Sequence, residues 1–491
     1  MNQYILTIDL GTTLIKLSLF NKALQPINTH YLNFDLERSL EFVELDAEQY
    51  WNTCKEGIKI LFQKSRIEPR DVSLISLSSQ AETLVVVDKN GIPLRKAISW
   101  LDNRSSYECM LLKNNFDINE GYRITGQPDI ITTWPITKIL WIKRNERDVF
   151  KNAYKYLLLK DYIIYKLTKK FVSEYTIYNF SYYFDMVKKN YWKKILDFVG
   201  ISIEQLPQLK EPGEIVGNVV KDNLDGLKFS SNTHLCLGAL DQMAGMIGVG
   251  NIRKGIISET TGTVIAICTM LDRPLINEYR IPCHYNAIKD TYTLLAVCES
   301  GGISLDWFKN NFYEDKDYNY INKEVEKIPS GSEGIVFLPY LTGVSSPEYN
   351  PKAKGVFYGL RLLHTRAHLA RAIMEGIAYV IKKNLEYFEK LGISAGKIIS
   401  LGGGSKSDIW NQIKADIFGR KVIVTKSEEP ASLGAAILGA VSLGLYKDVE
   451  DAVKDSVEVK KVYSPSYKKV YDMNYKEFIK LYKNIEEEFW F

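Results

Sequence analysis

Residues 4–20 read YILTIDLGTTLIKLSLF. An apolar segment that ends in Asp9 is followed by a Gly-Thr-Thr turn and by a second segment, in which apolar residues alternate with Lys16 and Ser18. Alternation with a period of two predicts a β-strand with one buried face. The stretch therefore predicts two strands joined by a tight turn, with a carboxylate near the end of the first strand.

The second half of the chain opens in the same way. Residues 254–270, KGIISETTGTVIAICTM, again predict a strand, a Thr/Gly turn and a strand. Residues 397–424 predict a strand, a glycine-rich turn, a helix and a strand. Two halves with this shared opening predict an α/β protein of two duplicated domains with a cleft between them. A chance likeness of two short stretches is the alternative. We expect the domains to cover residues 1–248 and 249–491.

The composition is that of a large globular protein. Of 491 residues, 46% are hydrophobic and 25% are charged, which suffices for a large core and roughly two to four domains. The net charge of +4 predicts no nucleic-acid surface. Six cysteines without CxxC spacing and five histidines without ligand spacing predict neither a disulfide framework nor a zinc site. Without a signal peptide or a stretch of roughly 20 apolar residues, we expect a cytoplasmic protein that makes no membrane contact.

The first turn carries groups suited to binding a magnesium nucleotide. Asp9 supplies a hard oxygen for a metal, and Gly11 permits close approach of the backbone. Thr12 and Thr13 supply hydroxyls that can donate to phosphate oxygens, and Lys16 adds a positive charge. These residues predict a phosphate-binding turn; a tight hairpin with a capping Asp is the alternative.

The second half contains two further loops of this kind. Residues 260–263 read TTGT, and residues 402–404 are three glycines that open a predicted helix. Helix N-terminal N–H groups bind anions, and glycines let a flat base approach the backbone. The chain has no G-x-x-x-x-G-K-[ST] motif, so it is not a P-loop NTPase. We expect a polyphosphate to be held from both sides of the cleft.

Asp241 is the single acidic residue of LGALDQMAGMIG, residues 237–248. A carboxylate among apolar and small residues is costly to bury unless another group pairs with it or the protein uses it. These surroundings make Asp241 a candidate functional residue. A structural cap on the helix that follows is the alternative.

Taken together, these motifs resemble the FGGY carbohydrate kinase family, which includes xylulokinase, glycerol kinase and gluconokinase. The most specific match is GVFYGLRLLHTRAHLARAIME, residues 355–375, which follows the spacing of the family's C-terminal signature. The resemblance implies the α/β actin/hexokinase-like ATPase fold, with two duplicated RNase H-like domains that close over a cleft. Further matches, in the family's order, are DLGTT (9–13), WLDNRS (100–105), GALDQMAGMIG (238–248), TTGT (260–263), GGGSKSDIWNQIKADIFGRKV (402–422) and EPASLGAAILGA (429–440).

The resemblance also implies the residues of the site. In the family the Asp of the DQ-x-AG stretch is the catalytic base, which implies that Asp241 accepts the proton of the attacking hydroxyl. It implies that Asp9 holds Mg²⁺ on the phosphate side. The residues expected to bind the nucleotide are Gly11, Thr12, Thr13, Lys16, Thr263, Gly302, Gly403, Gly404 and Asp408. The residues expected to bind the substrate are Gln80, Glu82, Asp102 and Gln242.

Several positions depart from the pattern of glycerol kinases. Lys16 stands in place of their Arg, which keeps the charge but loses the bidentate fork. Ala81 replaces the Arg of their NQRET motif, Thr133 lies near their substrate-contacting Tyr, and Asp408 replaces an Asn of the adenosine pocket. These departures argue against copying the glycerol assignment. Trp100 is a further substrate candidate, with a core aromatic residue as the alternative.

The function expected is ATP-dependent phosphorylation of a sugar or polyol hydroxyl, with ATP and Mg²⁺ as cofactors. A ketopentose such as xylulose is the leading substrate, and glycerol or another linear polyol, such as a tetritol, is the alternative. The rival from another class is an actin- or Hsp70-like ATP-binding protein without sugar kinase activity, because a fold alone does not give a function. The expected partner is therefore a small molecule, and a homodimer is left open.

Overall fold

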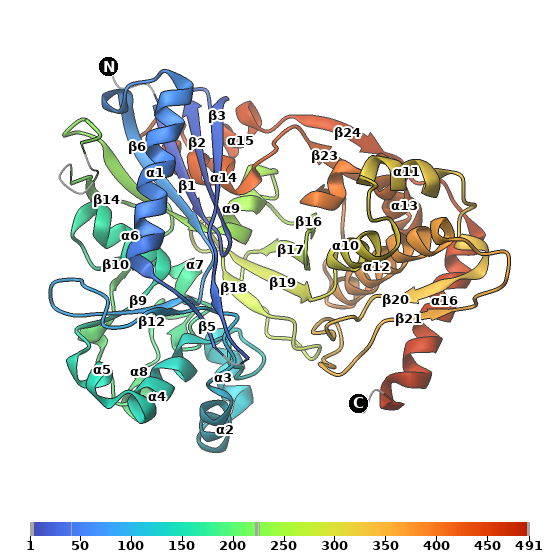
Figure 1. Cartoon of the computed structure of the whole chain (residues 1–491), viewed down its shortest axis with the longest axis horizontal. Coiled ribbons are helices and arrows are strands. Elements are labelled where there is room, and N and C mark those ends of the chain that lie inside the picture. The colour runs from blue at the N-terminus through green and yellow to red at the C-terminus, as the bar shows by residue number, and fades with distance from the viewer. Residues whose placement is uncertain (1–3, 41, 221–223, 225, 489–491) are drawn as a thin grey trace.

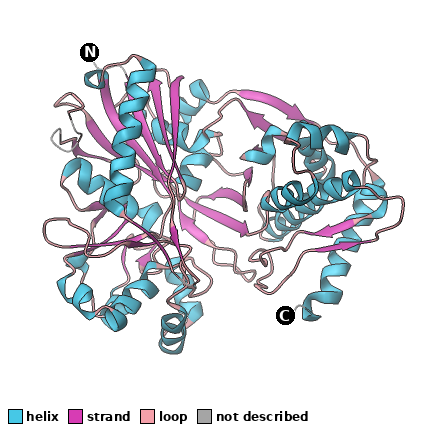
Figure 2. Ribbon diagram, viewed as in Figure 1, coloured by secondary structure: helices cyan, strands magenta, loops and turns pink. Residues whose placement is uncertain are grey.

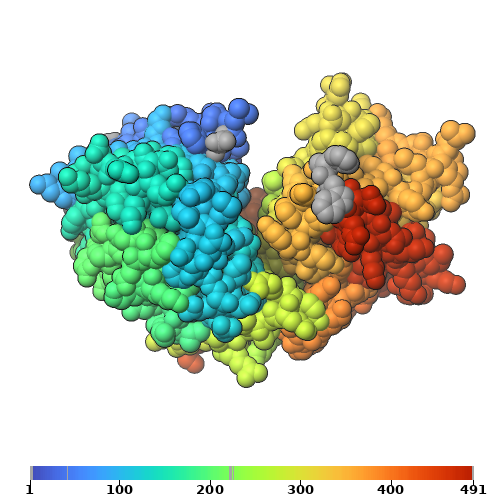
Figure 3. Space-filling view, turned by 90° about the horizontal axis from the view of Figure 1, so that it is seen from below, coloured from blue at the N-terminus to red at the C-terminus, as the bar shows by residue number. Residues whose placement is uncertain are grey.

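The computed structural model describes residues 4–40, 42–220, 224 and 226–488. The chain forms two lobes with a deep hollow between them (Figure 1, Figure 3). The N-terminal half, blue to green, builds one lobe, and most of the C-terminal half, yellow to red, builds the other. Each lobe contains a central sheet covered by helices (Figure 2).

The N-terminal central sheet has six strands in the order β14-β15-β6-β1-β2-β3. The strands β1, β2 and β3 form an antiparallel meander, and β6 and β15 run parallel to β1. The apolar stretches of β1, β6 and β15 are buried almost throughout, as expected for strands covered on both faces. Their bounds are β1 Tyr4–Leu10, β2 Leu14–Asn21, β3 Pro26–Asn33, β6 Val72–Ser79, β14 Ile215–Asn218 and β15 His234–Leu240.

The C-terminal central sheet has seven strands in the order β18-β19-β17-β16-β22-β23-β24. Here β16, β17 and β19 form the antiparallel meander, and β22 and β23 run parallel to β16. The five strands β1, β2, β3, β6 and β15 therefore have the same order and directions as β16, β17, β19, β22 and β23. This repeat confirms the predicted duplication and the actin/hexokinase-like fold. The bounds are β16 Ile256–Thr261, β17 Ile265–Leu271, β18 Cys283–Tyr285, β19 Tyr292–Cys298, β22 Lys397–Leu401, β23 Val422–Thr425 and β24 Val459–Tyr463.

The N-terminal lobe also carries a second sheet and most of its helices. The second sheet has the order β4-β5-β8-β7-β9 and lies below the six-stranded sheet in Figure 1. The strands of this sheet are β4 Glu37–Arg38, β5 Val43–Leu45, β7 Leu84–Val87, β8 Ala97–Ile98 and β9 Lys155–Leu158. Two separate two-stranded sheets pair β10 Val172–Glu174 with β13 Gln208–Lys210, and β11 Phe184–Asp185 with β12 Asn190–Tyr191. The helices are α1 Ala47–Ser65, α2 Ser106–Asn115, α3 Ile118–Thr125, α4 Pro135–Asn145, α5 Arg147–Asn152, α6 Leu159–Thr168, α7 Tyr175–Tyr178 and α8 Lys193–Val199.

The C-terminal lobe is completed by helices around its sheet. The long helix α12 lies at its centre and packs on α13 (Figure 1). Within the described ranges, no helix has both the length and the apolar character that crossing a bilayer requires. The remaining elements are α10 Ile303–Phe312, α11 Tyr318–Glu326, α12 Arg366–Lys390, α13 Asp408–Phe418, α15 Val449–Ser456, α16 Lys469–Ile485, β20 Val336–Leu338 and β21 Val356–Tyr358.

Two helices join the lobes. Helix α9 (Asp241–Gly248) follows β15 of the N-terminal sheet, and α14 (Pro430–Ser442) follows β23 of the C-terminal sheet. Their backbones touch, because a Cβ atom on Gly434 would lie 1.8 Å from the Ala244 carbonyl oxygen. Helix α14 also packs on the N-terminal sheet, where the Ser76 hydroxyl donates to the Ala435 carbonyl at 2.6 Å. At these two helices the lobes are therefore in close backbone contact.

Candidate active site

Three parallel strands of the N-terminal sheet end side by side. The register pairs Leu10 of β1 with Ser79 of β6, and Ser79 with Leu240 of β15. The segments that follow these residues therefore emerge at one edge of the sheet, where open α/β sheets commonly bind ligands. Asp241 is the first residue after β15 and begins α9 at this edge.

The C-terminal sheet presents a matching edge. Thr260 of β16 pairs with Leu401 of β22, so the turn at 262–263 lies beside the glycines at 402–403. A Cβ atom on Gly402, whose φ is 81°, would lie 3.0 Å from the Thr260 side chain. The glycine is therefore required both by its backbone angle and by its close neighbour.

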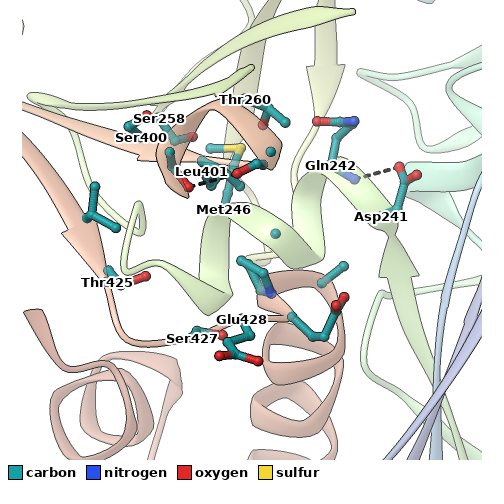
Figure 4. A pocket seen from close by; sticks show the side chains of 18 of the residues that line it. Asp241, Gln242, Met246, Ser258, Thr260, Ser400, Leu401, Thr425, Ser427 and Glu428 are labelled. Carbon is teal, nitrogen blue, oxygen red and sulfur yellow. Dashed lines mark hydrogen bonds between the residues drawn. The ribbon is translucent and has the colours of Figure 1, made fainter. Parts of the chain in front are cut away.

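A cavity of about 590 Å³ lies between these two edges. Figure 4 shows α9 along its wall, with Asp241 and Gln242 at one end of the helix and Ser258, Thr260 and Ser400 beside it. Of the predicted site residues, the ones that line the cavity are Asp9, Lys16, Asp241, Gln242 and Gly403. Hydroxyl groups also line it, from Ser258, Thr260, Ser400, Ser405, Thr425 and Ser427. Such a lining supplies many hydrogen-bond donors to a polyphosphate.

The Asp241 carboxylate lies at the wall of this cavity. Its Oδ1 accepts a hydrogen bond from the backbone N–H of Gln242 at 2.6 Å (Figure 4). Burial and the negative charge of Asp9 raise the pKa of Asp241 to about 7, although the Gln242 N–H, Lys16 and Lys160 oppose the change. The bond to Gln242 is of the kind that the capping alternative predicts. The position at the cavity and the pKa near neutrality fit a general base as well.

Lys16 bridges the two lobes. It pairs with Asp9 across β2 and β1, with 3.5 Å from its Nζ to Asp9 Oδ2. Its Nζ also lies 2.8 Å from Oε2 of Glu429, the residue that precedes α14. The Tyr31 hydroxyl donates to the other Glu429 oxygen at 3.0 Å. Burial opposes the charge of Lys16, but the two carboxylates outweigh burial and raise the pKa of Lys16, which therefore stays protonated.

Glu82 and Lys138 form a second charged group near Asp241. Glu82 lies between β6 and β7 with a φ of 64°, a left-handed conformation that costs a non-glycine residue energy and often marks a functional site. Lys138 of α4 is fully buried and donates to the Thr133 carbonyl at 2.9 Å. Burial raises the pKa of Glu82; Lys138 lowers it and Asp241 raises it further. Asp241 therefore lies close enough to Glu82 for its charge to raise the pKa of the Glu82 carboxyl group.

Two predicted substrate residues make hydrogen bonds inside the fold. Asp102 is fully buried and accepts hydrogen bonds from the Val43 N–H at 2.6 Å and from Arg104 Nε and Nη2 at 2.8 and 2.7 Å. These bonds occupy both oxygens and hold the fold, and Asp102 does not line the cavity; its role in substrate binding stays a prediction. Gln80 is also buried, and its side-chain amide bonds the Thr83 hydroxyl at 2.9 Å.

The predicted first phosphate turn is held in place by aromatic residues. The Tyr50 hydroxyl donates to the Gly11 carbonyl at 2.7 Å, and the Trp100 indole N–H donates to the Thr12 hydroxyl at 2.9 Å. Trp100 thus contacts the turn. Thr13 is exposed at its tip. These two bonds use the Gly11 carbonyl and the Thr12 hydroxyl and not the backbone N–H groups of the turn.

The predicted nucleotide residues of the C-terminal lobe divide into two groups. The Gly302 N–H donates to the Gly262 carbonyl at 2.6 Å, next to the exposed Thr263, so these residues form one loop cluster. Gly404 is buried below Gly403, and a Cβ atom there would lie 2.8 Å from Thr261.

Asp408 lies apart from this cluster. Its carboxylate accepts a hydrogen bond from Lys461 at 2.9 Å and another from the Tyr463 hydroxyl, both on β24. Lys461 is the main cause of its lowered pKa, and Asp408 is not among the residues that line the cavity. Asp408 thus contacts β24, and its assignment to the adenosine pocket stays a prediction.

Two residues of the site were not predicted from the sequence. Glu429 is the first residue of the EPASLGAAILGA stretch, which resembles the family but in which no role was predicted for the acid. Lys138 is a charged residue in the otherwise apolar PITKILWI segment, and that contrast is the signal that could have found it.

Comparison with known proteins decides the family. The model of the FGGY family of carbohydrate kinases matches with its N-terminal domain over residues 4–248 and with its C-terminal domain over residues 257–443. The chain belongs to the FGGY family of carbohydrate kinases. As an FGGY kinase it is an ATP-using phosphotransferase that acts on a small-molecule sugar, which excludes the actin- or Hsp70-like alternative.

Relatives of this FGGY kinase carry different substrate names. The chain is 31% identical to the xylulose kinase of Staphylococcus epidermidis over 95% of its length and 93% of the relative's. It is 30% identical to the gluconokinase of Bacillus subtilis over 93% of its length and 91% of the relative's. The crystal structure of a ligand-bound xylulose kinase from Lactobacillus acidophilus has a TM-score of 0.91 at 28% identity, with 98% of each chain covered. The Plasmodium falciparum glycerol kinase with ADP shares the fold, with a TM-score of 0.87 at 22% identity over 99% of this chain and 98% of that chain.

Proposed function

We propose that this FGGY kinase transfers the γ-phosphoryl group of ATP to a hydroxyl of a neutral ketopentose such as xylulose, with Asp241 as the general base. The observation that carries the proposal is the position of the Asp241 carboxylate. It lines the cavity together with Asp9 and Lys16, and its negative charge is one cause of the raised pKa of Glu82. A base in this position lies between a phosphate-binding half and an acceptor-binding half of one site.

The reaction requires one proton transfer and one phosphoryl transfer. Asp241 removes the hydroxyl proton while the acceptor oxygen forms a bond to the γ-phosphorus. The bond from that phosphorus to the β,γ-bridging oxygen breaks, and ADP leaves. The pKa of about 7 keeps a large share of Asp241 ionised at neutral pH and still gives it enough basicity to accept the proton.

The phosphate half of the site neutralises charge. Lys16, which stays protonated, and the N–H groups of residues 11–13 and of Thr263 would bind phosphate oxygens, with Thr260 and Gly403 on the opposite wall. The described residues contain no cluster of three His, Cys, Asp or Glu that could hold a metal alone. Mg²⁺ commonly needs only one or two carboxylates besides phosphate oxygens and water, and Asp9 fits that role. Bound there, Mg²⁺ would neutralise charge on the phosphates.

The acceptor half favours a neutral sugar. It contains Glu82, Asp241 and the buried Lys138; burial raises the pKa of both carboxyl groups and lowers the pKa of Lys138 to about 7. Burial therefore already disfavours charged forms here, and an aldonate would have to bury a further carboxylate in the same space. Glu82 and Gln242 can instead accept and donate hydrogen bonds to sugar hydroxyls.

We also propose Gly248, the last residue of α9, as the end of the N-terminal domain.

A coupled assay of ADP release tests the substrate class. Purified enzyme with Mg-ATP would be offered xylulose, gluconate, glycerol and erythritol, and kcat/KM determined for each. We expect the highest value for the ketose. A higher value for gluconate would contradict the charge argument, and a higher value for glycerol or erythritol would favour the linear polyols.

Two variants serve as controls in the same assay. Asp241→Asn gives the background, because it keeps the size of the side chain and removes the base. Asp197→Asn makes the same chemical change at an exposed carboxylate on α8, which pairs with Lys193 at 2.7 Å. We expect Asp197→Asn to retain wild-type turnover for the preferred acceptor; turnover by Asp241→Asn equal to that of Asp197→Asn would contradict the assignment of the base.

A further inference from the structure

A fully buried polar network lies behind the segment that carries Asp241. Lys160 at the start of α6 donates to Glu174 Oε1 at 2.8 Å, and neither side chain is exposed. Glu174 ends β10 and also accepts bonds from the backbone N–H of Thr176 at 2.6 Å and from the Thr176 hydroxyl at 2.7 Å. The carboxylate is therefore satisfied by three donors from two neighbouring elements.

The network reaches the residue that precedes Asp241. The backbone N–H of Leu240 donates to the Thr176 hydroxyl oxygen at 2.8 Å. A threonine hydroxyl has a single hydrogen, and Glu174 accepts it, so the oxygen of Thr176 is oriented to accept from Leu240. Leu240 is the last residue of β15, and Asp241 follows it as the first residue of α9. The chain of bonds thus runs from α6 through Glu174 and α7 to the strand end beside the base.

Stability alone is a poor reason for such a network. The free energy needed to remove both charges of a buried ion pair from water cancels most of their mutual attraction. Well-packed apolar residues of similar volume often stabilise a protein as much. A buried pair does impose one geometry, because breaking it leaves an unpaired charge in the interior.

The same pattern occurs at the other strand end of the site. Residues 173–176 read SEYT, and residues 258–261 read SETT. In the second case Glu259 pairs with the buried Lys414 at 2.6 Å and accepts from the Thr261 hydroxyl at 2.7 Å. Thr261 ends β16, directly before the second Thr/Gly turn. A buried Lys-Glu-Thr group therefore supports each of two strand ends that border the cavity.

We propose that Thr176, oriented by Glu174 and Lys160, is a positioning residue that sets the place of the Asp241 carboxylate through the Leu240 amide. The inference rests on the proposed role of Asp241. It concerns turnover and not binding, because Thr176 lies behind the strand end and is fully buried. Loss of its hydroxyl frees the strand end to shift, and small misplacements of a catalytic group lower kcat strongly.

The test is a set of threonine variants measured for kcat and for the KM of both substrates. Thr176→Val is chosen over changes at Lys160 or Glu174, because it removes the hydroxyl without leaving a buried charge unpaired. Thr176→Ser restores the hydroxyl. Thr168→Val is the matched control: Thr168 lies at the far end of α6, and its hydroxyl donates to the Ile164 carbonyl at 2.7 Å and accepts from the Lys170 N–H at 3.2 Å.

We expect Thr176→Val to lower kcat by about 10- to 100-fold with the KM for ATP nearly unchanged, and Thr176→Ser to recover most of the loss. The inference is overturned if Thr176→Val loses no more kcat than Thr168→Val, or if the serine variant is as slow as the valine variant. Asp241→Asn run in parallel separates the two proposals. If Asp241→Asn is slow while Thr176→Val is normal, only the positioning role fails; if Asp241→Asn is fast, the proposed function fails.

Discussion

Replacing Asp241 with Asn should stabilise the protein at pH 8 while it removes activity. The pKa of Asp241 near 7, against an ordinary value of 3.8, means that the folded protein holds this proton more tightly than the unfolded chain. The ionised carboxylate therefore destabilises the fold. The stability lost through this ionisation is zero below pH 3.8, grows as the pH rises from there to about 7, and reaches its full size above pH 7.

The size of the effect follows from the same values. The difference between the folded and unfolded pKa values of Asp241 lowers the free energy of unfolding by about 4 kcal/mol at pH 8 and by less than half of that at pH 5. Because the carboxylate borders an open cavity, solvent screening reduces the figure, and we expect about 2 kcal/mol at pH 8. The asparagine keeps the oxygen that accepts from the Gln242 N–H, so the start of α9 is preserved.

The assay is thermal unfolding of wild type, Asp241→Asn and Asp197→Asn at pH 5 and at pH 8. We expect Asp241→Asn to raise Tm by a few degrees at pH 8 and by clearly less at pH 5, with no such pH-dependent gain for Asp197→Asn. An Asp241→Asn variant that is no more stable than wild type at pH 8 would refute the reasoning. So would a gain of equal size at both pH values, because the effect would then not come from ionisation.

Three further outcomes are expected. Glu82→Gln should raise the KM for the sugar by about tenfold and leave the Kd for ATP, measured by titration calorimetry, unchanged. A loss of ATP affinity instead would place Glu82 in the phosphate half of the site. Lys16→Met should weaken ATP binding, and it should move the acid limb of the kcat/KM profile to higher pH, because Lys16 lowers the pKa of Asp241; an unmoved limb would contradict this. Gly434→Val should lower Tm, because its Cβ would lie 1.8 Å from the Ala244 carbonyl oxygen; an unchanged Tm would mean that α9 and α14 can separate.

The duplicated fold could be predicted from local patterns. The alternation in residues 4–20 and the Thr/Gly turns are properties of neighbouring residues, and they gave the strands β1, β2, β16 and β17 with nearly their observed bounds. Residues 46–65, DAEQYWNTCKEGIKILFQKS, likewise predict a helix that opens at Asp46. The structure forms α1 there, and the Asp46 side chain caps its first turn.

The roles of single polar residues were harder to predict, because they depend on partners that are distant in the sequence or turned inward. Asp102 sits in a motif that suggested substrate binding, yet Arg104, two residues later, turns back and occupies it. Asp408 is bonded by β24, more than fifty residues further along the chain. Glu429 meets Lys16 only because α14 crosses onto the N-terminal sheet, and no local pattern contains that crossing.

The account's central claim is that Asp241 is the general base of a sugar kinase, and turnover by Asp241→Asn tests it most directly. The measurement is kcat with the preferred acceptor, together with the Kd for ATP from calorimetry on the same preparation. The account predicts that kcat falls by about 10²- to 10⁴-fold while the Kd for ATP stays close to that of wild type. A kcat near the wild-type value would contradict it.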